Sequence, residues 1–220
     1  MPEKWSGLAR APDQLLAAVY HKVSYTMAHL LQPAMKEEEV ACYNRWLEQA
    51  KCIVEYGSGG STILALSKRN VRRILSIESD PQWIKQLSHL WRVRWARLTR
   101  RLNLHHVDIG PIKGFGYPAN DKQKPAWPMY AKAPWTIGAK PDLVLVDGRF
   151  RVACAAQVIL NAPHAIMVIH DFWKRPQYHH ILPFLVIRDR ARSLGVFAIN
   201  TDVDTGLVRD IFDRFMYVPD

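Results

Sequence analysis

Short apolar runs that alternate with helical patterns are the feature that most restricts the fold of this chain. The runs lie at residues 52–56, 73–78, 104–107, 142–147 and 165–169. Helical patterns separate them at residues 61–69, from Asp80-Pro81 to about Leu102, and at residues 152–161. Strands that are apolar throughout and alternate with helices predict a mostly parallel sheet buried on both faces.

The last part of the chain adds a predicted helix at about residues 179–193 and predicted strands at 196–200 and 212–218. Residues 109–140 are predicted to be a long irregular segment. The expected fold is therefore α/β, with a doubly wound, mostly parallel seven-stranded Rossmann-like sheet and N-terminal helices.

The first 50 residues are predicted to be a helical extension. Apolar residues from Leu15 to Leu31 recur at three- and four-residue spacings, and Pro33 interrupts that pattern. A second helix is expected at residues 36–49, where Glu37, Glu38 and Glu39 suit the positive end of a helix. Residues 51–220 are expected to form one compact domain.

Polar side chains follow the predicted strands where each strand ends. Right-handed crossovers place the carboxyl ends of parallel strands at one edge of the sheet, and ligands bind at that edge. The residues expected there are Glu55 to Thr62, Glu78, Asp108, Asp147, His170 and Asp171.

A glycine-rich turn follows the first strand, and it predicts a ligand loop. Gly57, Gly59 and Gly60 let the backbone turn sharply, and the helix after them presents free N–H groups. The dinucleotide fingerprint is not matched, because Thr62 stands where its third glycine is required. Glu78 ends the second strand, at the position of an acceptor for ribose hydroxyls.

The loop resembles the first motif of class I S-adenosylmethionine-dependent methyltransferases. The resemblance implies that Glu55 lies near the methionine moiety, that Glu78 accepts the ribose hydroxyls and that Asp108 flanks the adenine. Similarity to bacterial methyltransferase-like proteins of unassigned function extends over residues 76–80, 108–111 and 144–151. The implied cofactor is S-adenosylmethionine, with S-adenosylhomocysteine as product. The implied cofactor-binding residues are Glu55, Tyr56, Gly57, Ser58, Gly59, Gly60, Ser61, Thr62, Glu78, Asp108 and Asp147.

Methyl transfer requires alignment of an acceptor and, where necessary, removal of its proton. The candidate catalytic residues are Asp147, His170 and Asp171, which follow the fourth and fifth strands. The two carboxylates resemble the metal ligands of catechol-type O-methyltransferases, but Phe172 stands where that family has Asn. Because hard cations require several oxygen ligands, a bound divalent metal is not favoured and no metal ligand is assigned.

Arg149 and Arg151 follow the fourth strand. A guanidinium group binds carboxylate or phosphate through a planar fork, so both arginines are candidate substrate-binding residues for an anionic group. Ion pairing with Asp147, Asp171 or a helix acid is the alternative interpretation.

The formal net charge is +10, which favours acidic partners without choosing among them. In the helix around residues 91–101, Trp91, Trp95, Leu98 and Leu102 share a face among arginines. This pattern is typical of an amphipathic helix packed on the sheet, which is favoured over a nucleic-acid or membrane surface. The aromatic-rich segment 110–140 is a candidate lid over the site.

The predicted function is methyl transfer to a small or medium-sized acceptor, with O-methylation favoured. The alternatives are a non-catalytic cofactor- or nucleoside-binding protein, an RNA methyltransferase and an aminopropyltransferase. An RNA enzyme agrees with the charge but lacks the Asn/Asp-Pro-Pro-Tyr/Phe motif, since Asp147-Gly148-Arg149-Phe150 stands there. An odd number of cysteines predicts reduced thiols and a cytoplasmic setting, and no run reaches the length of a transmembrane segment. Nothing in the sequence predicts an oligomeric state.

Overall fold

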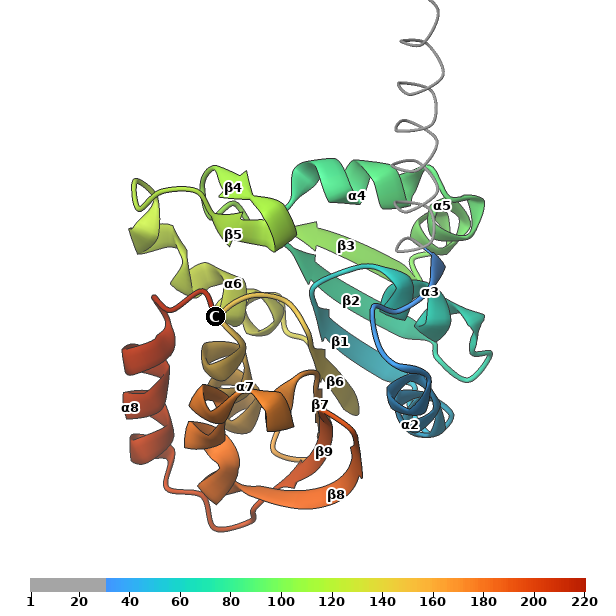
Figure 1. The fold of residues 1–220 in the computed structure, drawn as a ribbon. Helices are drawn as coiled ribbons and strands as arrows, with labels where there is room; N and C mark the ends of the chain where they lie inside the picture. Colours follow the sequence, from blue (N-terminus) through green and yellow to red (C-terminus); the bar gives the residue numbers. More distant parts are fainter. Residues whose placement is uncertain (1–30) are drawn as a thin grey trace, which may run out of the picture.

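A computed structural model describes residues 31–220, and a seven-stranded sheet forms their centre (Figure 1). The strand order is β3-β2-β1-β6-β7-β9-β8. All neighbours are parallel except the pairs of β9 with β7 and with β8. The strands are β1 (Cys52–Tyr56), β2 (Arg73–Glu78), β3 (Leu102–His106), β6 (Leu143–Val146), β7 (Ile166–Ile169), β8 (Leu185–Ala191) and β9 (Leu194–Ile199). The predicted fold is confirmed.

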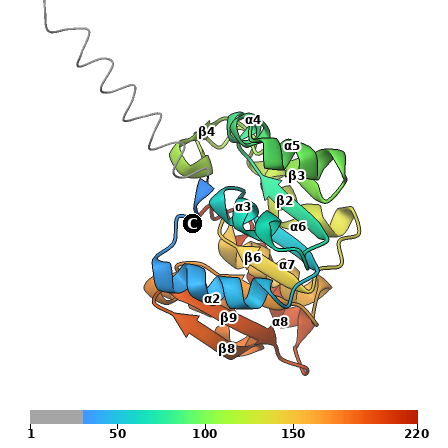
Figure 2. The ribbon, with the colours of Figure 1, turned by 90° about the vertical axis from the view of Figure 1, so that its right-hand side faces the viewer.

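Helices cover both faces of the sheet, as Figures 1 and 2 show. One face packs against α2 (Glu37–Leu47), α3 (Gly60–Ser67), α4 (Pro81–Ser88) and α5 (Trp91–Leu98). The other packs against α6 (Pro128–Thr136), α7 (Arg151–Asn161) and α8 (Thr205–Phe215). The predicted helix before residue 31 lies outside the described residues.

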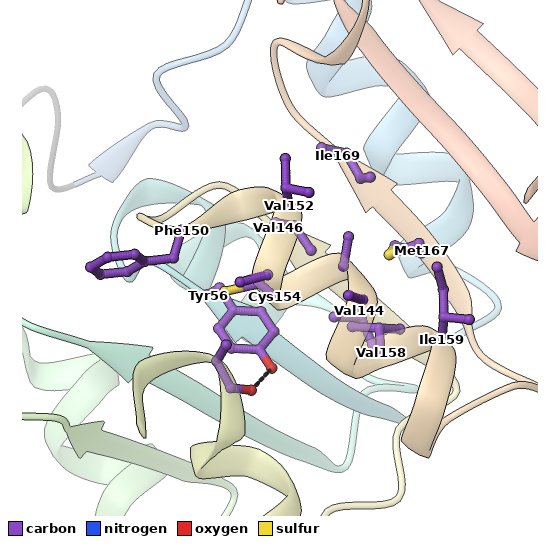
Figure 3. Packing of buried hydrophobic residues seen from close by; sticks show 14 of the residues in the cluster. Tyr56, Val144, Val146, Phe150, Val152, Cys154, Val158, Ile159, Met167 and Ile169 are labelled. Carbon is purple, nitrogen blue, oxygen red and sulfur yellow. Dashed lines mark hydrogen bonds between the residues drawn. The ribbon is translucent and has the colours of Figure 1, made fainter. Parts of the chain in front are cut away.

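Alternate residues of each central strand enter opposite layers of the core. Leu143 and Leu145 of β6 pack with the α2–α5 layer, whereas Val144 and Val146 pack with the α6–α8 layer. Figure 3 shows the second layer, where the buried Tyr56 hydroxyl donates a 2.7 Å hydrogen bond to the Ala131 carbonyl. A period of two with both faces covered explains why these strands are apolar throughout.

The predicted helix from Asp80 to Leu102 is wrong in one respect, because two helices occupy this range. The first begins as predicted, with the Asp80 carboxylate accepting from the N–H groups of Gln82 and Trp83. The chain then becomes extended at Leu90 before α5 starts. In one continuous helix Leu87 and Val93 would lie on different faces, whereas the break allows both side chains to be fully buried.

The predictions for the last fifty residues contain two errors. The helix predicted at 179–193 is instead a 3₁₀ segment, Pro176–Phe184, followed by strand β8. The predicted strand at 212–218 is mostly the helix α8, which Asp204 caps and in which Val208 and Phe212 are buried one turn apart. In the segment predicted as a helix at 179–193, Pro183 interrupts helical hydrogen bonding. The residues after it pair with β9 and therefore form strand β8.

The segment 109–140 is more ordered than predicted. It contains a small antiparallel pair, β4 (Ile112–Lys113) with β5 (Tyr117–Pro118), followed by α6. Trp127 and Tyr130 are buried in the core, while Phe115 is 90% exposed. Cys42, Cys52 and Cys154 are free thiols. No helix within residues 31–220 has the length and apolar character needed to span a bilayer.

Candidate functional site

A cavity of about 470 Å³ opens at the carboxyl ends of β1, β2, β6 and β7. The loops after these strands supply most of its walls, as the parallel topology requires. Of the predicted site residues, those lining the cavity are Gly57, Ser58, Gly59, Gly60, Ser61, Glu78, Asp147, Arg149, Arg151, His170 and Asp171.

The loop after β1 is held against the loop after β6. Gly57 has φ of +87°, and a Cβ atom there would lie 2.8 Å from the Gly148 Cα atom. A Cβ atom on Gly148 would lie 2.1 Å from the Tyr130 hydroxyl oxygen. Residues at these two positions must therefore lack a side chain so that the loops can approach each other.

Glu55 supports the glycine loop from below and does not line the cavity. Its carboxylate accepts hydrogen bonds from the hydroxyl groups of Ser61, Thr62 (2.6 Å) and Ser76 (2.8 Å). Burial raises the pKa of Glu55 to about 7, against the opposing effect of these hydrogen bonds. Through these hydrogen bonds Glu55 orders the glycine loop.

Glu78 lines the cavity and also fixes the loop. Its Oε2 atom accepts from the Ser58 backbone N–H (2.9 Å) and hydroxyl (2.8 Å), and its Oε1 atom accepts from the N–H groups of Ser79 and Asp80. Burial raises its pKa, although these donors favour the ionised form.

Asp147 lies on the opposite side of the cavity beside two cations. Its Oδ1 atom is 3.0 Å from Arg151 Nη2 and 2.9 Å from His170 Nδ1. Burial opposes ionisation, but Arg151 and then His170 outweigh it and lower the pKa of Asp147. Burial lowers the pKa of His170, but Asp147 outweighs this effect, so the pKa of His170 is raised.

Glu39 is a site residue that the sequence prediction missed. It lies on α2, is 2% exposed, and has Oε2 at 3.5 Å from His170 Nε2. Ser193 donates to its other oxygen through both the backbone N–H and the hydroxyl group. His170 thus stands between two carboxylates. The only sequence signal was an acidic residue in a first helical turn, which also suits the helix dipole.

Arg151 and Arg149 have different surroundings. Arg151 donates to the backbone carbonyls of Gly148, His170 and Asp147, in addition to its ion pair with the Asp147 side chain. Arg149 makes no ion pair with an Asp or Glu side chain within residues 31–220. Its Nη1 atom donates to the Asp220 main-chain oxygen at 2.9 Å, and its buried Nε atom has no hydrogen-bond partner there. Its guanidinium group lies 4.2 Å from the centre of the Tyr117 ring. The alternative interpretation, ion pairing, thus describes Arg151 alone.

In addition to Glu55, three other predicted cofactor-binding residues do not line the cavity. Tyr56 and Thr62 point into the protein interior, where both are fully buried. Asp108 is exposed, and its carboxylate accepts from the Gly110 N–H at 2.8 Å. Conversely, Phe115, Tyr130 and Arg175 line the cavity without having been predicted as site residues.

Solved structures of other proteins share this fold. A methyltransferase-like protein from Silicibacter pomeroyi shares 28% sequence identity with this chain and a TM-score of 0.74, over 86% of this chain and 100% of that one. The chain has the class I methyltransferase fold. A putative caffeoyl-CoA O-methyltransferase from Staphylococcus aureus has a TM-score of 0.51 at 10% identity, over 87% of this chain and 93% of its own. An S-adenosylhomocysteine-bound methyltransferase from Podospora anserina has a TM-score of 0.50 at 11% identity, over 89% and 100%.

No family model matches the sequence, and the search of curated proteins gave no match. The similarity to solved methyltransferase structures confirms the resemblance to class I methyltransferases. Within that methyltransferase fold, Phe172 is fully buried against Trp173 and Phe197. Residues 31–220 contain no cluster of three or more His, Cys, Asp or Glu side chains suited to a metal ion.

Proposed function

We propose that the protein is an S-adenosylmethionine-dependent methyltransferase that acts on an oxygen atom of a small anionic acceptor. The observation that carries this proposal is the cavity itself, in which a glycine loop and Glu78 face Asp147 across one continuous space. The similarity to a methyltransferase-like protein at 28% identity supports it.

The walls near β1 and β2 fit the cofactor. Gly57, Gly59 and Gly60 offer backbone without side chains, and the first turn of α3 presents N–H groups suited to the carboxylate of an amino acid. Glu78 would hold the ribose, with Ser58 exchanging its hydroxyl group for a ribose hydroxyl. S-adenosylmethionine supplies a methyl group already activated by its sulfonium.

Asp147 is the proposed base. Both cations contact its Oδ1 atom, while its Oδ2 atom has no hydrogen-bond partner within the described residues. The Oδ2 atom can therefore receive the proton of an acceptor hydroxyl. A low pKa makes Asp147 a weak base, which suits an acidic hydroxyl group.

His170 is proposed as a positioning residue, because both of its ring nitrogens face carboxylates and its raised pKa favours the charged form. Asp171 lines the cavity beside it and lies 3.7 Å from Arg175. We assign Asp171 to orienting the acceptor.

Arg149 is the proposed binding group for the anionic part of the acceptor. Its guanidinium group has no Asp or Glu side-chain partner within the described residues and keeps a buried Nε donor unused, so an anionic ligand can pair with it beside the Asp220 main-chain oxygen. Arg151 is assigned to fixing the loop after β6, because the protein already occupies its donors. Of the two arginines predicted to bind the substrate, only Arg149 thus keeps that role in the proposal.

We also propose that the chain consists of an N-terminal helical extension, residues 1–50, and a compact domain, residues 51–220, with α2 as the described part of the extension that packs on the domain. Cys42, Tyr43 and Leu47 of α2 belong to the core layer that the sheet shares with α3, α4 and α5. A cytoplasmic setting for the protein is proposed from its free thiols.

Isothermal titration with S-adenosylmethionine and S-adenosylhomocysteine tests the cofactor. We expect binding by the wild type, loss of at least tenfold in affinity in Glu78→Ala, and no change in Asp213→Asn, an exposed carboxylate on α8. No binding by the wild type contradicts the proposal.

A methyl-transfer screen of phenolic and other acidic hydroxyl acceptors, with and without an attached carboxylate, then tests the chemistry. We expect turnover of anionic acceptors that falls at least a hundredfold in Asp147→Asn with cofactor affinity largely retained. Cofactor binding without transfer to any acceptor, together with unaltered behaviour of Asp147→Asn and Asp171→Asn, would instead identify a non-catalytic binding protein.

A further inference from the structure

Helix α5 exposes the apolar side chains that were expected to face the sheet. Trp91, Trp95 and Leu98 are 72%, 62% and 76% exposed, whereas Val93 and Ala96 on the opposite side are buried. The spacing of the first three residues places them on one face of the helix, called here the α5 face. An exposed group of large apolar side chains marks an interaction surface more often than a simple solvent-facing helix.

The sequence around the α5 face carries charge of one sign only. From Pro81 to Val107 the chain contains no Asp or Glu. The basic residues in this range are Lys85, Arg92, Arg94, Arg97, Arg100 and Arg101. Helix α8, which is also amphipathic and has an exposed leucine, instead mixes Arg209 and Arg214 with Asp210 and Asp213. This segment therefore favours an anionic occupant for the α5 face, although Glu37 of α2 lines a pocket together with Arg92.

A second copy of the chain does not meet this requirement. A twofold contact through the α5 face would place Arg92, Arg94 and Arg97 of one copy opposite the same arginines of the other, and like charges repel.

A single-stranded nucleic acid meets the charge requirement but leaves part of the face unexplained. Bases stack on open aromatic rings, whereas the Arg92 guanidinium group already lies 5.6 Å from the centre of the Trp91 ring. The largely exposed Leu98 offers no stacking surface. A leucine beside two tryptophans is instead suited to the boundary between lipid headgroups and acyl chains.

We propose that the α5 face docks the protein on an anionic lipid surface. Trp91, Trp95 and Leu98 enter the interfacial layer, and the flanking arginines contact headgroup phosphates. The α5 face does not contribute to the cavity, so this docking is independent of the proposed methyl transfer.

Sedimentation of the full chain with vesicles tests the proposal. The vesicles consist of phosphatidylcholine alone or with roughly one third phosphatidylglycerol, which supplies the negative surface. We expect binding to the anionic vesicles only, weakened by added salt because the contact is electrostatic. Affinity should fall at least tenfold in Trp91→Ser/Trp95→Ser, and roughly fivefold for each change in Arg92→Gln/Arg94→Gln.

The matched control is Leu207→Ser/Arg209→Gln, which makes equivalent changes on α8 and should leave vesicle binding unaltered. The unfolding midpoint and cofactor affinity of Trp91→Ser/Trp95→Ser should equal those of the wild type, since both side chains are exposed. Absence of binding to anionic vesicles, or equal binding by the α5 and α8 variants, overturns the proposal. Binding of an oligonucleotide that the α5 variants lose, without vesicle binding, assigns the face to nucleic acid instead.

Discussion

The two sides of the cavity hold their carboxylates in different ways. On the side of β1 and β2, Glu55 and Glu78 accept hydrogen bonds from hydroxyl and backbone N–H groups, and burial raises the pKa of both. On the side of β6 and β7, Asp147 pairs with Arg151 and His170, and these cations lower its pKa despite burial.

This difference shows how the same chemical group serves two purposes at one sheet edge. Here the neutral donors fix the position of each carboxylate and stabilise its charge only in part, because burial still raises the pKa, so such a group is suited to shaping a loop. A neighbouring cation keeps a carboxylate ionised, which suits it to receive a proton or orient a ligand. The predictions below alter one side at a time.

The largest expected effect follows from Arg151→Met. The change leaves Asp147 without one of the two cations at its Oδ1 atom and leaves three backbone carbonyls without their donor. We expect the free energy of unfolding to fall by about 3–5 kcal/mol. Urea unfolding at neutral pH measures this, with Arg175→Met as control, since that half-buried arginine makes a looser pair with Asp171. Equal losses in the two variants would show that Arg151 has no special structural role.

Glu55→Gln tests the side that lacks cations. Because the folded-state pKa of Glu55 is raised to about 7, its stabilising contribution is present in acid and is lost as the pH rises through that value. The stability of the variant relative to the wild type should therefore improve by roughly 3 kcal/mol between about pH 4 and about pH 8. Denaturant unfolding across this range is the measurement.

Asp147→Asn should show the opposite dependence on pH. The lowered pKa of Asp147 contributes stability above the unfolded value of 3.8, and that stability is lost as the pH falls through the folded value. The variant should thus be less stable than the wild type at neutral pH, with the penalty shrinking in acid. The same pH slope for both variants would refute the contrast between the two sides.

Gly148→Ala tests the contact that joins the sides. The added methyl group would overlap the Tyr130 hydroxyl and crowd the Gly57 backbone, so we expect a loss of about 1–3 kcal/mol in stability together with weaker cofactor binding. Gly114→Ala is the control, since a Cβ atom there meets nothing within 4 Å. Thermal unfolding measures the stability and titration calorimetry measures the cofactor affinity of the two variants. Equal values for both variants would contradict the prediction.

The smallest effect is expected for Asp108→Asn. The Asp108 side chain is exposed and lies outside the cavity, so S-adenosylmethionine affinity should change less than about twofold, within ordinary surface effects. A tenfold loss in calorimetry would instead support the adenine contact that the family resemblance implies and would extend the cofactor site beyond the cavity described.

Local signals in the sequence predicted the glycine loop and Glu78 at the cavity on the β1–β2 side, although Tyr56 and Thr62 of the same loop do not line it. The glycines of the loop, Glu55 below them and Glu78 one strand further all lie within thirty residues, and a strand–turn–helix unit fixes their arrangement. The β6–β7 side was only partly predictable. Asp147 and His170 were predicted because they follow strands, but Glu39 reaches His170 from a helix more than one hundred residues earlier.

For helix α5 the amphipathic pattern predicted the wrong face to be buried. The pattern of Trp91, Trp95 and Leu98 predicted a buried face, but Val93 and Ala96 are buried instead. Hydrophobicity alone favours burial of the larger side chains. The chain is extended at Leu90, however, and the helix that starts after it buries its other face.

The sequence by itself determined the alternation of strands and helices, the sheet edge and the glycine loop, because these depend on periodicity and on residues close together in the chain. The tertiary structure decided the β8–β9 hairpin, the position of Glu39 beside His170, the lack of an acidic side-chain partner for Arg149 within the described residues and the exposed face of α5. Each of these depends on which distant segment packs against a residue. Local pattern carries little of that information, since burial and charge pairing are properties of neighbours in space.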